Sequence, residues 1–422
     1  MNPLRQFSTT EVMSFRPVVE RPAPGETPLG LELELEPDGH GHLVGVATIF
    51  LRGAECSFKC TMCDLWKFTH VQPTPRGAIP AQIAATVQQL PPRWETHIPL
   101  PPPHTSTGRH SSPSIEGGQA ANPARERGEE APSRPRRAAG SENPRDVPPQ
   151  GAGRGSGVTS RREELTDEEP HKRWVAPNEC KRWVAPVEWI KLYNAANFFS
   201  ATNVPPDDLP QIARLVRDRF ARVIVENHPR LCHRGVELFQ AALEGTRLEI
   251  ATGLETVHPR LLRWLNKQAE LEDFARAFAW LHRRGIDTRA FVLLGLPGLS
   301  RNEAVEWCVR SVAWALDHHC RHVSIIPLRA TNGLLENLVT SGDLQLPTLD
   351  DIEAVTQRTL ALRHEGRVVM TDPWDLDKVA GGCSHCRPLQ RARFQGMNLA
   401  QRAWPAVHCS CTAAPSDPHG CV

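Results

Sequence analysis

The sequence predicts an α/β fold built on a parallel β-sheet, and two observations support this prediction. Short segments rich in β-branched residues alternate with segments of helical periodicity along most of the chain. Parallel neighbouring strands need a crossover connection, which is usually a helix, so the repeated strand-then-helix order indicates a parallel sheet. Six such units are compatible with an open doubly wound sheet or with a partial barrel, and in both folds ligands gather at the carboxyl ends of the strands.

The first predicted strand is HLVGVATIFL at 42–51, a β-branched run that is followed by a cysteine-rich loop and a helix at 79–90. Five further segments are predicted as strands, at 189–199, 222–227, 247–256, 286–298 and 322–329. Helical spacing of apolar residues predicts helices at 206–220, 235–245, 271–285 and 301–319. Gly285 is the expected stop of the helix that begins at 271.

The segment 97–186 interrupts this alternation. Between His104 and Pro170 it has four large aliphatic residues and no aromatic residue among many Pro, Gly, Arg, Ser and Glu. Such a composition cannot bury enough apolar surface to offset the entropy cost of ordering the chain, so we predict a disordered low-complexity insertion. Its end repeats KRWVAP at 172–177 and 181–186, which is typical of a short duplication and not of a solenoid.

Composition excludes some classes of protein and partner. Lys plus Arg number 49 and Asp plus Glu 48, and this balance predicts neither a nucleic-acid nor a membrane partner. No apolar run approaches the roughly 20 residues that span a bilayer, and the first residues lack the apolar core of a signal peptide, so we expect a cytoplasmic protein. Twelve cysteines in 422 residues are too sparse for a disulfide scaffold, and grouped cysteines in a reducing compartment indicate metal ligands or redox groups.

Three cysteines lie in the loop after the first predicted strand, at Cys56, Cys60 and Cys63. The spacing Cys-x3-Cys-x2-Cys can wrap one loop around a single metal centre. A structural zinc site normally has four protein ligands, and His70 is the nearest candidate for the fourth. An iron–sulfur cluster fits three cysteines better if one iron is meant to bind an exogenous ligand.

The stretch GAECSFKCTMCDLW at 53–66 resembles the radical S-adenosylmethionine (SAM) enzymes, whose hallmark is this cysteine loop after the first strand of a partial (β/α)6 barrel of the TIM type. The resemblance implies that Cys56, Cys60 and Cys63 hold a 4Fe–4S cluster whose open iron is chelated by SAM. It also implies reductive cleavage of SAM to methionine and a 5′-deoxyadenosyl radical, which abstracts hydrogen from a substrate. Met62 is a mild departure, because the family often has an aromatic residue there.

Later strand ends resemble the same family, and in particular a group that includes the radical subunit of archaeosine synthase and, more distantly, the elongator catalytic subunit. KLYNAANFF at 191–199 ends the second strand where the generic family often has a Gly-Gly-Glu type stretch. EIATGLETVHPRLLRWLNK at 249–267 resembles the GLET loop of that group, and FVLLGLPGLSRNEA at 291–304 resembles the fifth strand with its glycine-rich turn. The residues implied to seat SAM are Asn194, Ala195, Ala196, Asn197, Glu255, Gly295 and Gly298.

Several of these positions also have a purely structural interpretation. Gly295 and Gly298 bracket a proline after an apolar strand, which allows close approach of a flat ligand but is also typical of a simple turn. Glu255 could accept hydrogen bonds from a ligand, or it could be a carboxylate at a helix start. Arg329 and Asn332, after the sixth strand, are candidates for substrate contacts at the mouth of the barrel or for a solvated connection.

A second group of cysteines lies near the carboxyl terminus, where Cys383 and Cys386 form a CxxC motif. This motif is a common half of a zinc site or of an auxiliary cluster, and Cys409 and Cys411 are the candidates that would complete it. Three arginines follow the motif and fit either contacts to RNA phosphates or a solvated helix face. They are Arg387, Arg391 and Arg393.

The sequence thus predicts a radical SAM enzyme with an N-terminal extension at 1–40, a core barrel at 41–96 and 187–340, the insertion at 97–186 and a C-terminal extension at 341–422. The expected cofactors are a 4Fe–4S cluster and SAM, with zinc or an auxiliary cluster at the CxxC motif. The expected partners are an electron donor such as a flavodoxin or ferredoxin and, from the resemblance, a tRNA whose base is the substrate. The alternative is a non-catalytic, zinc-stabilised RNA-binding protein.

Overall fold

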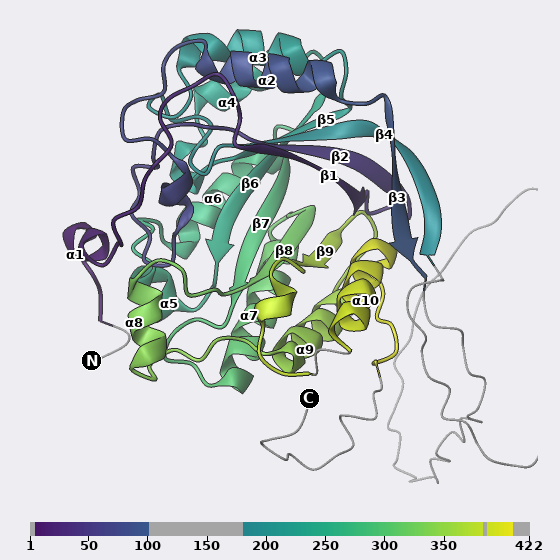
Figure 1. Cartoon of the computed structure of the whole chain (residues 1–422). Helices are drawn as coiled ribbons and strands as arrows, with labels where there is room; N and C mark the ends of the chain where they lie inside the picture. Colours follow the sequence, from purple (N-terminus) through teal and green to yellow (C-terminus); the bar gives the residue numbers. More distant parts are fainter. Residues whose placement is uncertain (1–4, 101–179, 383–385, 408–422) are drawn as a thin grey trace, which may run out of the picture. The chain divides into compact units, whose positions relative to one another are not determined.

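A computed structural model describes residues 5–100, 180–382 and 386–407, all of which lie in one compact unit. Its nine-stranded sheet curls into a partial barrel (Figure 1). The strands follow the order β1-β2-β4-β5-β6-β7-β8-β9, and β3 pairs with β4 outside this path. The strands are β1 Gly30–Pro37, β2 Leu43–Phe50, β3 Arg93–Pro99, β4 Cys180–Tyr193, β5 Arg222–Glu226, β6 Arg247–Glu255, β7 Asp287–Leu294, β8 His322–Pro327 and β9 Val368–Thr371.

The strands from β2 to β9 along this path are parallel, and β1 is antiparallel to β2. The partial TIM-type barrel that the sequence predicts is therefore confirmed. The six predicted strands correspond to β2 and to β4 through β8. Among the described residues, no helix combines the length and apolar character that crossing a membrane requires.

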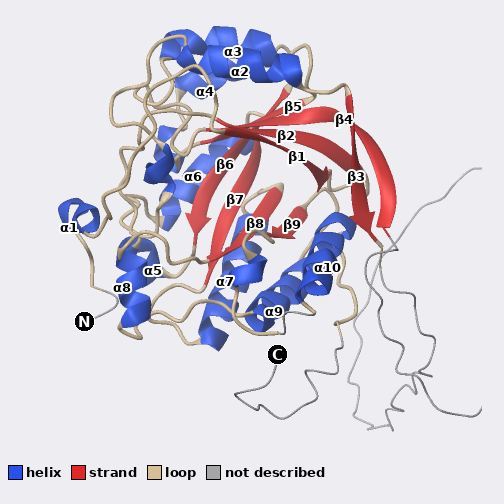
Figure 2. Ribbon diagram, viewed as in Figure 1, coloured by secondary structure: helices blue, strands red, loops and turns tan. Residues whose placement is uncertain are grey.

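Helices pack around the curled sheet (Figure 2). Ala47 and Ile49 of β2 join Ile83 of α2 in one buried apolar group, whereas Val46 faces the barrel interior with Trp189. Both faces of β2 are buried, which explains its continuous apolar run. The helices are α1 Thr9–Ser14, α2 Ala78–Gln89, α3 Leu209–Val216, α4 Arg234–Ala242, α5 Pro259–Trp264, α6 Leu271–His282, α7 Arg301–Asp317, α8 Leu334–Thr340, α9 Leu349–Leu360 and α10 Arg387–Ala400.

The predicted bounds of the insertion, 97–186, differ from the structure at both ends. Residues 97–99 belong to β3 and residues 180–186 to β4, and these strands pair antiparallel as far as Pro99 and Cys180. Most side chains of this ribbon are exposed or half-buried. Backbone hydrogen bonds pair its strands, so its amino-acid composition lacks the apolar residues by which a buried strand is recognised. The rest of the predicted insertion, 101–179, lies outside the described residues.

The two predicted extensions also contribute strands to the sheet. β1 lies within the N-terminal extension 1–40, and β9 lies within the C-terminal extension 341–422. In β1 the alternation of Leu and Glu was not recognised as a strand pattern, because the carboxylates face inward. Glu34 and Glu36 both form ion pairs with the buried Lys191 of β4, at 2.7 and 2.6 Å.

Near the amino ends of the strands, the barrel interior contains a network of buried ion pairs around Glu36 and Glu249. Arg289 bonds both carboxylate oxygens of Glu36 at 2.7 Å and Oε1 of Glu249 at 2.8 Å. Arg222 and Arg321 donate to the other oxygen of Glu249 at 2.9 and 2.6 Å. Burial by itself raises the pKa of Glu249, but the three guanidinium groups outweigh it and hold this pKa well below its ordinary value.

Candidate metal centre

The cysteine loop, residues 52–64, follows β2 at the carboxyl end of the parallel strands. Cys60 is buried, and Cys56 and Cys63 are half-buried; none of the three is in a disulfide. The loop therefore lies at the edge where the ends of β4 through β8 also emerge, which is the edge at which barrels of this kind bind ligands.

Burial disfavours the thiolate form of all three cysteines. Burial raises the pKa of each, to about 12 for Cys60 and to about 11 for Cys63. The ammonium of Lys267 acts in the opposite direction on Cys56 and Cys60. Because thiolates are the metal ligands, a metal that binds here must displace the thiol protons. Across the part of the chain that the structure describes, no group of three or more Cys, His, Asp or Glu could hold a single metal ion.

His70, the candidate fourth zinc ligand, supports the stem of the cysteine loop through its backbone. Glu55 N donates to the His70 carbonyl at 3.0 Å, and His70 N donates to the Gly53 carbonyl at 3.1 Å. The His70 ring is buried, and its Nδ1 lies 2.7 Å from the carbonyl oxygen of Gln72.

The end of β4 contacts the first cysteine directly. The amide Nδ2 of Asn197 donates to Cys56 Sγ at 3.0 Å. Ala195 adopts a positive φ of 53°, in the turn between β4 and Asn197, and Ala196 is half-buried. Of the four predicted SAM-seating residues on this turn, Asn197 is thus the one that the structure brings to a cysteine.

Asn194 lies fully buried on the same turn. Neither atom of its side-chain amide has a hydrogen-bond partner, although its backbone N donates to Glu226 Oε2 at 3.2 Å. Burial raises the pKa of Glu226 to about 7, although backbone hydrogen bonds from Ala195 and Asn194 oppose the shift. This edge of the barrel therefore holds an unpaired amide beside a carboxyl group that titrates near neutral pH.

Glu255 ends β6 at a β-bulge, with a positive φ of 62°. Its Oε1 forms a buried ion pair with Lys267 Nζ at 2.7 Å, and the same ammonium donates to the Gly253 carbonyl at 2.6 Å. An added Cβ at Gly253 would overlap Oε1 of Glu255 and Nζ of Lys267, so both side chains would have to shift. Burial lowers the pKa of Lys267, but Glu255 and Cys60 outweigh it, and the net shift is upward.

Lys267 belongs to the loop 264–268, which we name the brace loop because it holds the cysteine loop. Thr61 N donates to the Leu265 carbonyl at 3.0 Å, and Asn266 Nδ2 donates to the Lys59 carbonyl at 2.9 Å. Asn266 and Gln268, on either side of Lys267, have positive φ values of 52° and 58°. These two left-handed residues flank the lysine that pairs with Glu255 inside the barrel.

Two aromatic rings add a further contact between these loops. Phe58, between the first two cysteines, stacks on His228 with ring centroids 3.8 Å apart. His228 Nε2 lies 3.0 Å from the Lys267 carbonyl, and burial lowers the His228 pKa to about 3. The neutral ring can donate one hydrogen bond at Nε2, so it links the cysteine loop to the brace loop.

The glycine-rich turn after β7 lies elsewhere on the edge. Gly295 has a φ of 94°, and an added Cβ there would overlap Pro347 of the same chain. Gly298 has a φ of 71°, and its N lies 3.3 Å from the Asp343 carbonyl. Packing within the chain thus already explains the glycine at 295, and a cofactor role for these two residues stays a prediction.

The loop after β8 was predicted as either a substrate contact or a solvated connection, and it supports the cysteine loop. Asn332 is buried and donates through Nδ2 to the Thr61 carbonyl at 2.6 Å. Arg329 is 3.6 Å from Asp372 and 3.9 Å from Asp375 in ion pairs.

The second cysteine group falls largely outside the described residues, which include neither Cys383 nor Cys409 nor Cys411. Cys386 is buried at the start of α10. The three arginines of α10 bind the chain itself: Arg387 donates to the Leu376 carbonyl at 2.9 Å, Arg391 pairs with Asp377 at 3.0 Å, and Arg393 pairs with Glu353 at 2.7 Å. Arg393 is only 3% exposed, so it belongs to neither a solvated face nor an RNA surface.

Sequence reasoning missed Lys267, Glu55 and the brace loop. The stretch that ends in Lys267 was recognised by its GLET loop, but no spacing indicates that the lysine turns inward to a carboxylate 12 residues earlier. Glu55 could have been noticed, because it is a charged residue directly before the first cysteine.

No protein-family model matches the chain. The chain is 26% identical over 189 residues to archaeosine synthase subunit beta of Methanosarcina acetivorans, a match that covers 44% of this chain and 54% of that subunit. It is 29% identical over 136 residues to an uncharacterized protein of Methanocaldococcus jannaschii, covering 32% of this chain and 40% of that protein. These matches span about half, or less, of the length of the curated relatives.

Among solved structures, Elp3 of Methanocaldococcus infernus is 16% identical, with a TM-score of 0.38 over 49% of this chain and 54% of that one. Coproporphyrinogen III oxidase from Escherichia coli, a radical SAM enzyme, is 17% identical, with a TM-score of 0.32 over 42% of this chain and 39% of that one. These scores limit the structural likeness to part of the fold. The match to archaeosine synthase subunit beta falls in the group that the motifs predict, and the chain thus resembles the radical SAM superfamily.

Proposed function

We propose that the chain is a radical SAM enzyme that binds a 4Fe–4S cluster through Cys56, Cys60 and Cys63. The observation that carries the proposal is that one loop holds all three cysteines, outside any disulfide, at the carboxyl end of the first parallel strand. When bound and reduced, such a cluster supplies the electron that cleaves SAM to methionine and a 5′-deoxyadenosyl radical, which removes hydrogen from a substrate.

The residues around the cysteine loop are chemically compatible with a bound iron–sulfur cluster and with SAM. The Asn197 amide donates to Cys56 Sγ, and hydrogen bonds to cluster sulfurs are one means by which proteins tune a cluster. Lys267 provides a buried positive charge that favours thiolates over thiols. Asn194 is fully buried with an unpaired amide, and a bound ligand would supply the missing hydrogen bonds.

In this proposal the four residues Asn194 to Asn197, together with Glu255, Gly295 and Gly298, seat SAM. Glu255 forms an ion pair with Lys267, so a ligand would meet a carboxylate whose charge is balanced by a lysine. Glu226, whose pKa is raised to about 7, can hold or release a proton near neutral pH. It is therefore the carboxyl group that we propose for proton transfer at this edge.

The proposed substrate is a nucleobase in tRNA, and the support for it is the similarity to archaeosine synthase subunit beta. A flavodoxin or ferredoxin is the proposed electron donor. We further propose that Cys383 and Cys386 contribute to a second site for zinc or an auxiliary cluster, since CxxC is a common half of such sites.

Anaerobic reconstitution with iron and sulfide tests the cluster. We expect a brown protein with broad visible absorption, and a colourless product from the triple variant Cys56→Ala, Cys60→Ala and Cys63→Ala. The control variant replaces two isolated half-buried cysteines, Cys180→Ala and Cys232→Ala, and should stay brown. A colourless wild-type protein with stoichiometric zinc would contradict the proposal and favour the zinc-stabilised RNA-binding protein.

A further inference from the structure

The N-terminal segment 5–21 meets the cysteine loop at Glu55, the residue before Cys56. Arg16 Nη1 lies 2.8 Å from Glu55 Oε1, and Arg21 Nη1 lies 3.0 Å from Oε2. Lys59, within the cysteine loop, forms a third ion pair with the same carboxylate. The Glu55 side chain is only 12% exposed, so water competes weakly for these contacts.

The same two arginines also contact residues after the third cysteine. Arg21 donates through Nε to the Thr69 carbonyl and through Nη2 to the Thr69 hydroxyl, both at 2.8 Å. The Arg16 guanidinium lies 4.7 Å from the ring centroid of Trp66, in the 3-10 helix Leu65–Phe68. Residues 16 and 21 thus hold the stretch 55–69, which contains all three cysteines, at both its ends.

The segment is anchored beyond the cysteine loop as well. Phe7 is 4% exposed and packs edge-on against Trp264, the first residue of the brace loop, with centroids 6.3 Å apart. Phe15 lies so close to Gly333, after β8, that an added Cβ there would overlap the Phe15 carbonyl. The segment therefore joins two further loops, and both of them contact the cysteine loop.

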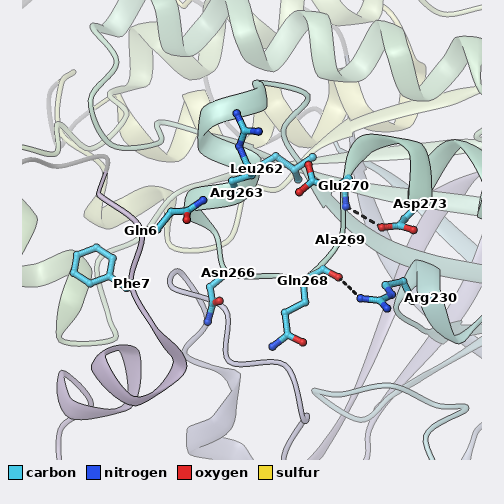
Figure 3. Close-up of a pocket in the computed structure, with 10 residues that line it drawn as sticks. All are labelled: Gln6, Phe7, Arg230, Leu262, Arg263, Asn266, Gln268, Ala269, Glu270 and Asp273. Carbon is cyan, nitrogen blue, oxygen red and sulfur yellow. Dashed lines mark hydrogen bonds between the residues drawn. The ribbon is translucent and has the colours of Figure 1, made fainter.

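Packing between the segment and the brace loop leaves a hollow of about 340 Å³ (Figure 3). Gln6 and Phe7 line it from the segment, and Asn266 and Gln268 line it from the brace loop (Figure 3). Phe7 and Val12 anchor the segment in the apolar core, and the ion pairs at Glu55 connect it to the cysteine loop.

We propose that residues 5–21 form a clasp that holds the cysteine loop in place and shields it, and that Glu55 is the positioning residue through which Arg16 and Arg21 act. Its effect on an iron–sulfur cluster rests on the proposed function, whereas its effect on the cysteine loop itself does not. Without the arginines, Glu55 keeps Lys59 as its only ion-pair partner among the described residues, and the loop gains freedom to open.

Hydrogen–deuterium exchange on the metal-free protein tests the mechanical part. In the double variant Arg16→Gln and Arg21→Gln, we expect exchange of residues 54–69 to accelerate on the order of tenfold, with the sheet strands unchanged. The control Arg182→Gln removes an exposed cation outside the segment, which pairs with Glu95 on the β3–β4 ribbon, and should have no effect. Unchanged exchange in 54–69, or equal acceleration in β5 to β8, would overturn the clasp.

The rate at which a reconstituted cluster bleaches in air tests the shielding. We expect bleaching about tenfold faster in the double variant and in Glu55→Gln, and wild-type rates in Arg182→Gln. The double variant Arg16→Lys and Arg21→Lys keeps both charges but loses the forked contact of Arg21 to Thr69, so it should restore part of the protection. Equal rates in all variants would refute shielding. A wild-type protein that takes up no cluster would refute the proposed function, while the exchange measurement would still decide the clasp.

Discussion

The two ends of the barrel interior differ in how their carboxyl groups are held. At the amino end, Glu36 and Glu249 are held by buried guanidinium groups at hydrogen-bonding distance. At the carboxyl end, the Asn194 amide has no partner, and burial raises the pKa of Glu226 to about 7. The ion pairs at the amino end stabilise one arrangement of the fold, although the ring nitrogens of His322 there also lack hydrogen-bond partners among the described residues. At the carboxyl end, the Asn194 amide and the Glu226 carboxyl group are not held by ion pairs to any residue that the structure describes, and they can contact a ligand.

We expect the largest effect on stability from a substitution in the ion-pair network at the amino end of the barrel. Glu249→Gln leaves Arg222, Arg289 and Arg321 without their shared buried carboxylate, and we expect the free energy of unfolding to fall by about 3–5 kcal/mol. Urea unfolding measures this change. In the control Glu237→Gln, the lost pair with Arg284 is 33–41% exposed, so less than about 1 kcal/mol should be lost. Equal losses of unfolding free energy in Glu249→Gln and Glu237→Gln would show that the buried network stabilises the fold no more than a surface ion pair.

Gly253→Ala should have the next largest effect, because the new Cβ would displace the Glu255–Lys267 pair at the carboxyl end. Overpacking of this kind costs about 1–3 kcal/mol, and we also expect reduced uptake of iron. Thermal unfolding and iron content per chain are the measurements. Gly30→Ala is the control, since its Cβ would meet only Phe50 at 3.6 Å. Normal iron content in Gly253→Ala would show that the ion pair does not matter for the site.

Glu226→Gln should change how stability depends on pH. The folded-state pKa of about 7 lies above the ordinary value of 4.5, so the folded state binds this proton more tightly than the unfolded state. Its contribution is fully present below about pH 4.5 and is lost as pH rises through 7. Relative to wild type, the variant should thus gain up to about 3 kcal/mol between pH 4.5 and pH 8.

Urea unfolding at several pH values measures this slope. Glu188→Gln, an exposed carboxyl group on β4, should leave the profile of the wild type unchanged. If the free energy of unfolding of Glu226→Gln ran parallel to that of the wild type across this pH range, Glu226 would be ionised in the folded protein at pH 6.

The smallest effect is expected from the insertion. Pro99 and Cys180 are paired Cα partners at the end of β3 and β4, so a short glycine–serine turn can replace residues 101–179 without moving the sheet. We expect a stability change below about 1 kcal/mol and unchanged cluster content, measured by unfolding and by iron analysis. Loss of the cluster would show that the insertion contributes to the site.

The parallel strands β2 and β4 through β8 were predictable because their buried parts stand out as apolar β-branched runs, whereas β9, with four residues, is too short to do so. β1 and β3 were not predictable either, since β1 carries inward carboxylates and β3 lies in a largely exposed ribbon. The cysteine loop was predictable from its spacing together with the resemblance of the later strand ends, because its three cysteines are local in the sequence.

The support of the cysteine loop was not predictable in the same way. Arg16 and Arg21 reach Glu55 across 39 and 34 residues, and Asn332 reaches Thr61 across 271. No periodicity links residues so far apart, and a surface arginine and a structural arginine have the same appearance in a single sequence. Asn197 was found only because the resemblance pointed to the end of the second strand.

The central claim, that the carboxyl end of the barrel is a radical SAM site, is tested most directly by product formation. The anaerobically reconstituted protein is reduced with dithionite and incubated with SAM, and 5′-deoxyadenosine is quantified by liquid chromatography. We predict its formation by the wild type and by the Cys180→Ala, Cys232→Ala control, and its absence in the Cys56, Cys60, Cys63 triple alanine variant. A brown, fully loaded wild-type protein that forms no 5′-deoxyadenosine would contradict the claim.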